Sequence, residues 1–423
     1  MFRNSLSLAL VLALCGAATG QEASSPDSPQ ELEDRIKKLE QRLEEVTVTA
    51  TRVDEKLEDT PILDALRSVE VYGFVNAAYS FNLRDPSGRR GRNGLRLSDP
   101  DHNTFRIPYA KLGLARRVSG LNELDAGFRF EVGVGRMVEE AFNQSGDVLG
   151  DKSIGVPQAH VDLQIPTPFN PLLLRVGRTY GWFGVESLDL PANPHYSLSH
   201  FAQFGPKTTT GVSLGMDLGA GLRYTQYLVN GWDRVLDNNG AKTLGGQLSW
   251  EIEDPSISLA LNWIYGAERD DNAHDQRWMV ELAATWQPTE SLDLRAAFRY
   301  GQEELSASSS YSSYGQDEGT ANFGGFLVMA KQSFFKVEDA DYYRVALGVR
   351  GGFFRDEGGS RSGVDQTLGE LTGTLSINLL ENAAFRVEYR RDFSSEGDAF
   401  AGHRGQNSRS SQDTLSFDLS YSF

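Results

Sequence analysis

The sequence predicts an all-β membrane protein, a barrel of about sixteen antiparallel strands of the kind found in outer membranes. Three observations carry this prediction. Apolar and polar residues alternate in short segments from residue 69 to the C-terminus. The connections between these segments are short and long in turn, and the last segment is an amphipathic run that ends in Phe423.

The alternation has a period of two residues. Val71, Val75 and Tyr79 share one side of the first segment, whereas Asn76 and Ser80 share the other. Successive side chains of a strand point to opposite faces, so each segment has an apolar face and a polar face. The predicted strands are 69–83, 105–118, 124–134, 159–165, 172–176, 210–218, 222–228, 244–252, 257–265, 278–286, 292–300, 323–334, 343–353, 371–379, 385–389 and 415–423.

The connections differ in length at the two ends of the predicted barrel. Short ones, such as 119–123 and 379–382, alternate with long polar ones. Outer-membrane barrels have short periplasmic turns and long external loops. The long loops are predicted at 84–103, 136–155, 179–208, 232–242, 267–276, 302–321, 355–366 and 393–412.

The apolar face is predicted to meet lipid. A soluble sandwich would turn that face toward a second sheet, whereas a closed barrel satisfies every backbone group inside hydrocarbon. Aromatic residues at strand ends, such as Trp250 and Trp286, fit an interfacial girdle. The closing residues Phe417, Leu419, Tyr421 and Phe423 resemble the signal that the barrel-assembly machinery reads. That machinery is therefore an expected partner, together with outer-membrane lipid.

The N-terminus predicts export. Residues 1–20 contain an arginine and an apolar run at 6–14, which indicates a signal peptide. The only cysteine, Cys15, lies in this segment, so the exported chain would form no disulfide and no thiolate metal site. A net charge of -17 argues against a nucleic-acid partner. Residues 21–30 are rich in Ser, Pro and Glu and predict a disordered linker.

Two further segments precede the barrel, which is predicted over 69–423. Residues 31–46 predict a periplasmic helix with a heptad seam, either a trimeric coiled-coil stalk or a solvated amphipathic helix. The seam residues are Leu32, Ile36, Leu39, Leu43 and Val46. Residues 47–68 predict an extended linker, which with the end of the helix resembles the start of TonB-dependent receptors. The plug domain of those receptors has no counterpart, because the first strand follows at once.

The barrel region resembles the OmpL-like β-barrel porins. The resemblance lies in VYGFVNAAYSFN (71–82), NGLR (93–96), the long segment 176–212 and LVNGWD (228–233). It implies an outer-membrane porin of a Gram-negative bacterium. In general porins the long loop at the place of 179–208 folds inward, so this loop is expected to narrow the pore or, alternatively, to stay on the surface.

Charged residues on the polar faces are candidates for the pore lining, because rings of charge set ion preference in a water-filled channel. We predict a transverse field at the constriction between Arg129 and Arg175 of the wall and Glu186 and Asp189 of the loop. The predicted wall residues are Arg223, Arg295, Arg299, Arg344, Arg386, Glu131, Glu281 and Glu388. The alternative is that such charges only form solvated cross-strand pairs.

No catalytic motif places a nucleophile, metal or phosphate site, so the chain is predicted not to be an enzyme and to need no cofactor. His195 and His200 share one loop and could bind a metal, but without carboxylates at a suitable spacing they are expected to be surface residues. The leading hypothesis is passive, weakly selective diffusion of small hydrophilic solutes or ions through a homotrimer. The alternatives are TonB-linked uptake without a plug, and a barrel that tethers the outer membrane to the cell wall.

Overall fold

The computed structural model describes residues 37, 38, 41, 42, 44, 68–84, 86, 92–142, 153–253, 256–306, 319–338, 340, 342–397, 399–401 and 407–423. The predicted signal peptide, the two linkers up to residue 67 and all five seam positions lie outside these residues. Residues 37, 38, 41, 42 and 44 are helical and exposed. Within the described ranges, no helix has the length and apolar character needed to cross a membrane.

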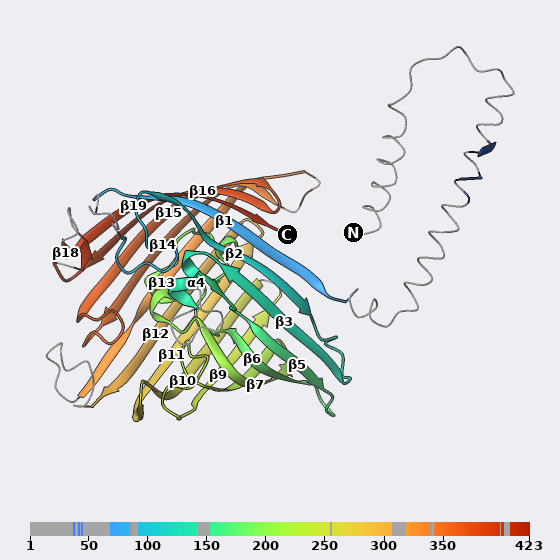
Figure 1. Ribbon diagram of the computed structural model, residues 1–423, viewed down its shortest axis with the longest axis horizontal. Coiled ribbons are helices and arrows are strands. Elements are labelled where there is room, and N and C mark those ends of the chain that lie inside the picture. The colour runs from blue at the N-terminus through green and yellow to red at the C-terminus, as the bar shows by residue number, and fades with distance from the viewer. Residues whose placement is uncertain are drawn as a thin grey trace, which may run out of the picture. The chain divides into compact units, whose positions relative to one another are not determined.

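Sixteen antiparallel strands close into a barrel, in which each strand pairs with its neighbours along the chain and β1 pairs with β19 (Figure 1). The barrel strands are β1 Glu70–Asn82, β2 Thr104–Arg116, β3 Asp125–Val134, β5 Ala159–Ile165, β6 Leu172–Tyr180, β7 Thr208–Gly219, β8 Leu222–Val229, β9 Thr243–Ile252, β10 Ser256–Arg269, β11 Asn272–Thr289, β12 Leu292–Leu305, β13 Gly319–Lys336, β14 Tyr343–Asp356, β15 Gln366–Leu380, β16 Ala383–Ser394 and β19 Ser411–Ser422. The two-residue strand β4 (Ile154–Gly155) extends the sheet beside β3.

All sixteen predicted segments are strands, so the predicted barrel is confirmed. The long loop predicted at 267–276 is wrong. β10 and β11 continue to Arg269 and from Asn272, and only two residues join them. The polar residues at this hairpin end pair with one another, as in the 2.7 Å ion pair between Arg269 and Asp275, so polarity here marks strand ends and not a loop.

The outer face of the barrel is apolar and exposed, as a surface in contact with lipid must be. Along β14, Leu347 is 51% and Val349 is 58% exposed, whereas the alternate residues Ala346 and Arg350 are buried inside. Phe423 pairs its backbone with that of Gly73 at 2.9 and 3.0 Å and keeps a side chain that is 54% exposed. The C-terminal residue therefore sits at the seam where the sheet closes.

The interior holds loops as well as wall residues. Helix α4 (Arg136–Ala141), the 3-10 helix η1 (Leu190–Ala192) and helix α5 (His200–Phe204) are short segments of the long connections. A further hairpin, β17 (Phe400–Ala401) with β18 (Asn407–Arg409), lies in the last connection. Met137 of α4 packs in one buried cluster with Leu97, Tyr109, Leu190 and Tyr196. Three connections and the wall of β2 thus share one apolar core inside the barrel.

At the seam where the barrel closes, the space beside Gly73 is too small for a side chain. A Cβ on Gly73 would lie 2.2 Å from the carbonyl oxygen of Lys111 on β2 and 2.9 Å from the ring of Phe423. Gly73→Ala is expected to cost about 1 to 3 kcal/mol, as overpacking does. A Cβ on Gly351 meets nothing within 4 Å, so Gly351→Ala is the matched control.

The measurement is the temperature at which the folded barrel loses its faster migration in detergent gels. Gly73→Ala should lower that temperature, and Gly351→Ala should leave it where it is. Equal temperatures for both variants would show that contact with Lys111 and Phe423 does not limit this position.

Candidate functional site

Residues 181–207, between β6 and β7, lie inside the barrel against the inward side of β11–β16. Leu190 and Leu198 are buried, as are the ring of Tyr196 and that of Phe201. The segment contains two short helical turns. Pro191 lies in the middle of η1, and the Ser199 hydroxyl accepts a hydrogen bond from the Ala202 amide at 3.2 Å to cap α5.

Five inward-facing arginines, here called the anchoring arginines, donate hydrogen bonds to the backbone carbonyls of this loop. They come from β12, β14 and β16. The bonds are Arg295 to Val185 at 3.1 Å, Arg299 to Phe201 at 2.7 Å, Arg350 to Ser197 at 2.5 Å, Arg386 to Asn193 at 2.9 Å and Arg390 to Leu198 at 2.6 Å. Buried carbonyls need such donors, and residues 181–207 form no strand ladder that could supply them.

Two inward-facing carboxylates hold the amides of the same loop. Glu281 on β11 accepts from the Gly184 amide at 2.5 Å. Glu388 on β16 accepts from the amides of Tyr196 and Ser197 at 2.7 and 3.1 Å. The wall therefore offers donors to the loop carbonyls and acceptors to the loop amides, which is what an inward loop requires in place of a sheet ladder.

Aromatic packing fixes the two ends of the loop. Trp182 stacks on Tyr227 of β8 with ring centroids 3.8 Å apart and planes 6° apart. Phe204 of α5 stacks on Phe354 of β14 at 4.9 Å. The polar bonds and these contacts reach opposite parts of the wall, so the loop crosses the interior of the barrel.

The loop carboxylates that we predict for the constriction have partners on different strands. Asp189 accepts from Lys111 on β2 at 2.6 Å and from the Tyr180 hydroxyl at 2.8 Å. Glu186 pairs with Arg350 on β14 at 3.0 Å and is buried. Burial raises the pKa of the Glu186 carboxyl, and the Arg350 charge opposes that shift.

The predicted wall partners of these carboxylates, Arg129 and Arg175, are paired elsewhere. Arg129 on β3 lies 3.3 Å from Glu131, which also accepts from Lys111 at 3.1 Å. Arg129 therefore connects to Asp189 only through Glu131 and Lys111. Arg175 on β6 makes a bidentate pair with Asp162 on β5 at 2.7 and 2.8 Å. A chain of ion pairs thus links Arg129 to the loop, whereas Arg175 is paired with the neighbouring strand.

The predicted wall residues divide into two groups. Arg295, Arg299, Arg386, Glu281 and Glu388 bind the loop, and Glu131 anchors Lys111. Arg223 on β8 and Arg344 on β14 are exposed to the lumen. Within the described residues, neither has a hydrogen bond or an ion pair. The sequence did not separate these groups, because a pattern of alternation does not show what covers an inward face.

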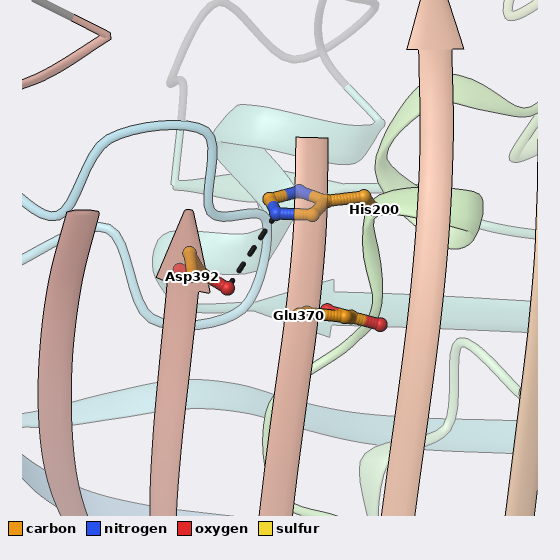
Figure 2. Close-up of side chains that lie close together, drawn as sticks. All are labelled: His200, Glu370 and Asp392. Atoms are coloured by element: carbon orange, nitrogen blue, oxygen red, sulfur yellow. Dashed lines mark ion pairs between the residues drawn. The ribbon is translucent and has the colours of Figure 1, made fainter. Parts of the chain in front are cut away.

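A buried cluster joins the loop to strands β15 and β16. His200, Glu370 on β15 and Asp392 on β16 lie together, with the His200 imidazole directed at Asp392 (Figure 2). His195 and His200 are 1% and 2% exposed, so the expectation that they are surface residues is wrong. Their loop turns inward, and the wall covers both rings.

The cluster has side chains of the types that bind metal ions, but arginine side chains already contact its carboxylates. Glu370 oxygens lie 3.3 Å from Arg350 and 2.6 Å from Arg390. Asp392 accepts from Arg390 at 2.7 Å and from Arg96 at 2.8 Å. A divalent cation placed there would meet three guanidinium groups and compete with them for the same oxygens. We therefore assign the cluster to the ion pairs that hold the loops.

Two residues of these networks were not predicted as site residues. Lys111 carries its charge on β2, in a segment that alternates weakly, and Arg96 lies in the long connection before it. Arg96 bridges Asp99 at 2.7 Å and Asp392 at 2.8 Å with its side chain fully buried. Long-range pairs of this kind depend on the inward path of a loop, which local sequence does not show.

Comparison with known proteins supports the architecture. A family model described as beta-barrel porin-2, OmpL-like, matches residues 68–423. Among solved structures, the chain is similar to an anion-selective porin from Comamonas acidovorans, with 14% identity, 84% of this chain and 99% of that chain covered, and a TM-score of 0.55. A comparison with curated proteins gives no match.

Two further structures have the same fold. One is the outer membrane channel DcaP of Acinetobacter baumannii, with 13% identity, coverage of 84% and 97%, and a TM-score of 0.54. The other is OmpF of Salmonella typhi in complex with daunomycin, with 13% identity, coverage of 84% and 97%, and a TM-score of 0.55. Fold and family place this chain in the outer membrane of a Gram-negative bacterium, as a porin-like channel. Because the family model spans the whole barrel, the chain belongs to the OmpL-like family of β-barrel porins.

Proposed function

We propose that this protein is a water-filled channel for passive, weakly selective diffusion of small hydrophilic solutes. The observation that carries the proposal is the loop 181–207, which crosses the barrel and is bonded to its wall along its length. Such a loop narrows a lumen and keeps a fixed aperture. Membership in a porin family supports a channel and not an enzyme.

Weak selectivity follows from the pairing of charges near the proposed constriction. Asp189 and Glu131 share Lys111, and Glu186 is paired with Arg350. Lys207, at the end of the loop, has its pKa lowered by burial, although Asp233 at 3.6 Å opposes that shift. Charges that neutralise each other at close range leave a small net field for a passing ion. Arg129, Arg175, Glu186 and Asp189 are thus proposed to shape the constriction through partners on the wall.

We also propose a homotrimer, exported by the signal peptide at 1–20 and assembled by the barrel-assembly machinery. One structural relative, OmpT of Vibrio cholerae, is described in a trimer form, at 9% identity and a TM-score of 0.51. The predicted heptad helix at 31–46 would add contacts between protomers in the periplasm. Grouped conductance steps in threes would support the trimer.

Passive diffusion predicts ohmic behaviour. Purified full-length protein in planar bilayers should give stepwise conductance that rises with salt concentration.

Deletion of residues 44–51 should leave both this conductance and solute uptake by proteoliposomes or cells unchanged, because a passive pore needs no energising partner. Loss of uptake by cells with intact conductance would instead favour the TonB-linked hypothesis.

The anchoring arginines predict how the aperture can be widened. Arg386 donates to the carbonyls of Leu190, Asn193 and His195, while its other nitrogens bind Asp418 at 2.8 to 3.2 Å. Arg386→Lys keeps the charge beside Asp418 but loses the planar fan of donors. Each lost bond from a charged donor costs about 1.5 to 3 kcal/mol. The loop should loosen, and single-channel records should show a larger, noisier conductance.

The matched control is Arg344→Lys, which makes the same exchange at an inward arginine that has no hydrogen bond to the described part of the loop. It should conduct like the unaltered protein. If Arg386→Lys and Arg344→Lys give the same steady conductance as the parent chain, the loop does not set the aperture.

A further inference from the structure

We infer that the barrel contains a binding site for small anions that carry phosphate or carboxylate groups, on the wall formed by β2, β3 and β5–β8. The inference rests on the proposed channel function and names a class of solute for it. A cavity of about 610 Å³ lies there, beside the short turns and away from the anchoring arginines. We call it the vestibule. Its lining includes Arg116, Arg129, Arg175, Arg223, His160 and Asp162.

The guanidinium groups face the vestibule and their carboxylate partners lie behind them. The Arg175 side chain is 35% exposed and that of Asp162 is 11% exposed. The Arg129 side chain is 32% exposed, whereas that of Glu131 is fully buried. A solute in the vestibule therefore meets N–H donors first, although the charges are paired. Carboxylates placed in this way fix the orientation of the arginines for a ligand.

The Arg175 guanidinium has N–H groups left over for a ligand. Arg175 uses Nε and Nη2 for Asp162, so Nη1 remains available. The His160 ring lies 2.9 Å from Asp162 Oδ1, the same oxygen that accepts from Arg175 Nε, and helps to hold this carboxylate in place. Planar guanidinium groups with spare N–H bonds match the oxygen spacing of phosphate and carboxylate groups.

Arg223 differs from the other arginines of the vestibule, each of which forms an ion pair with a carboxylate. It is exposed, lines the vestibule and, within the described residues, has no hydrogen bond or ion pair. Asp217 stands opposite it in the register of β7 and β8. However, Asp217 accepts from the Gly219 amide at 2.7 Å and so caps the turn between the strands. The Asp217 carboxylate keeps its negative charge and also lines the vestibule, so the preference for anions rests on the N–H donors of Arg223 and Arg175 that no described carboxylate binds.

The experiment measures equilibrium binding of inorganic phosphate to the full chain in detergent by calorimetry, with Arg223→Gln as the test variant. Loss of one charge-assisted hydrogen bond should weaken phosphate binding about tenfold. Arg344→Gln is the control, because it removes from β14, outside the vestibule lining, another exposed arginine that has no ion pair among the described residues. Its affinity for phosphate should match that of the parent chain. Heat-modifiable migration checks that each variant is folded.

A second measurement separates this site from the channel itself. In planar bilayers under a salt gradient, Arg223→Gln should move the reversal potential toward cations, and Arg344→Gln should move it less. Absent phosphate binding, or equal weakening by both variants, would overturn the anion site while leaving a conducting pore intact. Binding that depends on Arg223 in a protein without conductance would overturn the channel proposal and keep the site.

Discussion

Satisfaction of backbone hydrogen bonds is the constraint on which the rest of this structure depends. In hydrocarbon no water can pair an exposed amide or carbonyl, so the sheet must close on itself. The pairing of β1 with β19, which ends at Gly73 and Phe423, removes the last free edge. Closure then leaves an inner surface whose side chains are free to serve another purpose.

The same constraint acts on the loop that enters the barrel. Residues 181–207 have little regular secondary structure, only η1 and α5, so most of their backbone groups lack internal partners. Arginine is suited to this task because one guanidinium can serve several acceptors at once. Arg386 reaches three loop carbonyls and Asp418 together. The anchoring arginines of β12, β14 and β16 are therefore bound to a loop and are not free for solutes.

The strands of the barrel could be predicted from the sequence, but the contacts of its inward-facing residues could not. A period of two residues identifies strands because one face meets lipid and the other does not, as at Leu347 and Arg350 of β14. It does not identify what an inward residue contacts. Arg223 and Arg386 both occupy inward positions, yet one is exposed and the other is buried under a loop. That difference arises from contacts between residues almost two hundred positions apart, which local patterns do not encode.

Some inward arginines are buried under the loop and others are exposed in the vestibule. This difference explains how a strongly acidic chain can hold a surface that favours anions. The net charge of -17 counts every residue equally, but a solute responds to the groups that it can reach. On the wall of β12–β16, the anchoring arginines bind loop carbonyls and buried carboxylates. On the other side, carboxylates such as Glu131 and Asp162 lie beneath their arginines and turn the donors outward. The selectivity of such a channel is therefore set by the depth at which each sign of charge is placed, and the overall charge is a poor guide to it.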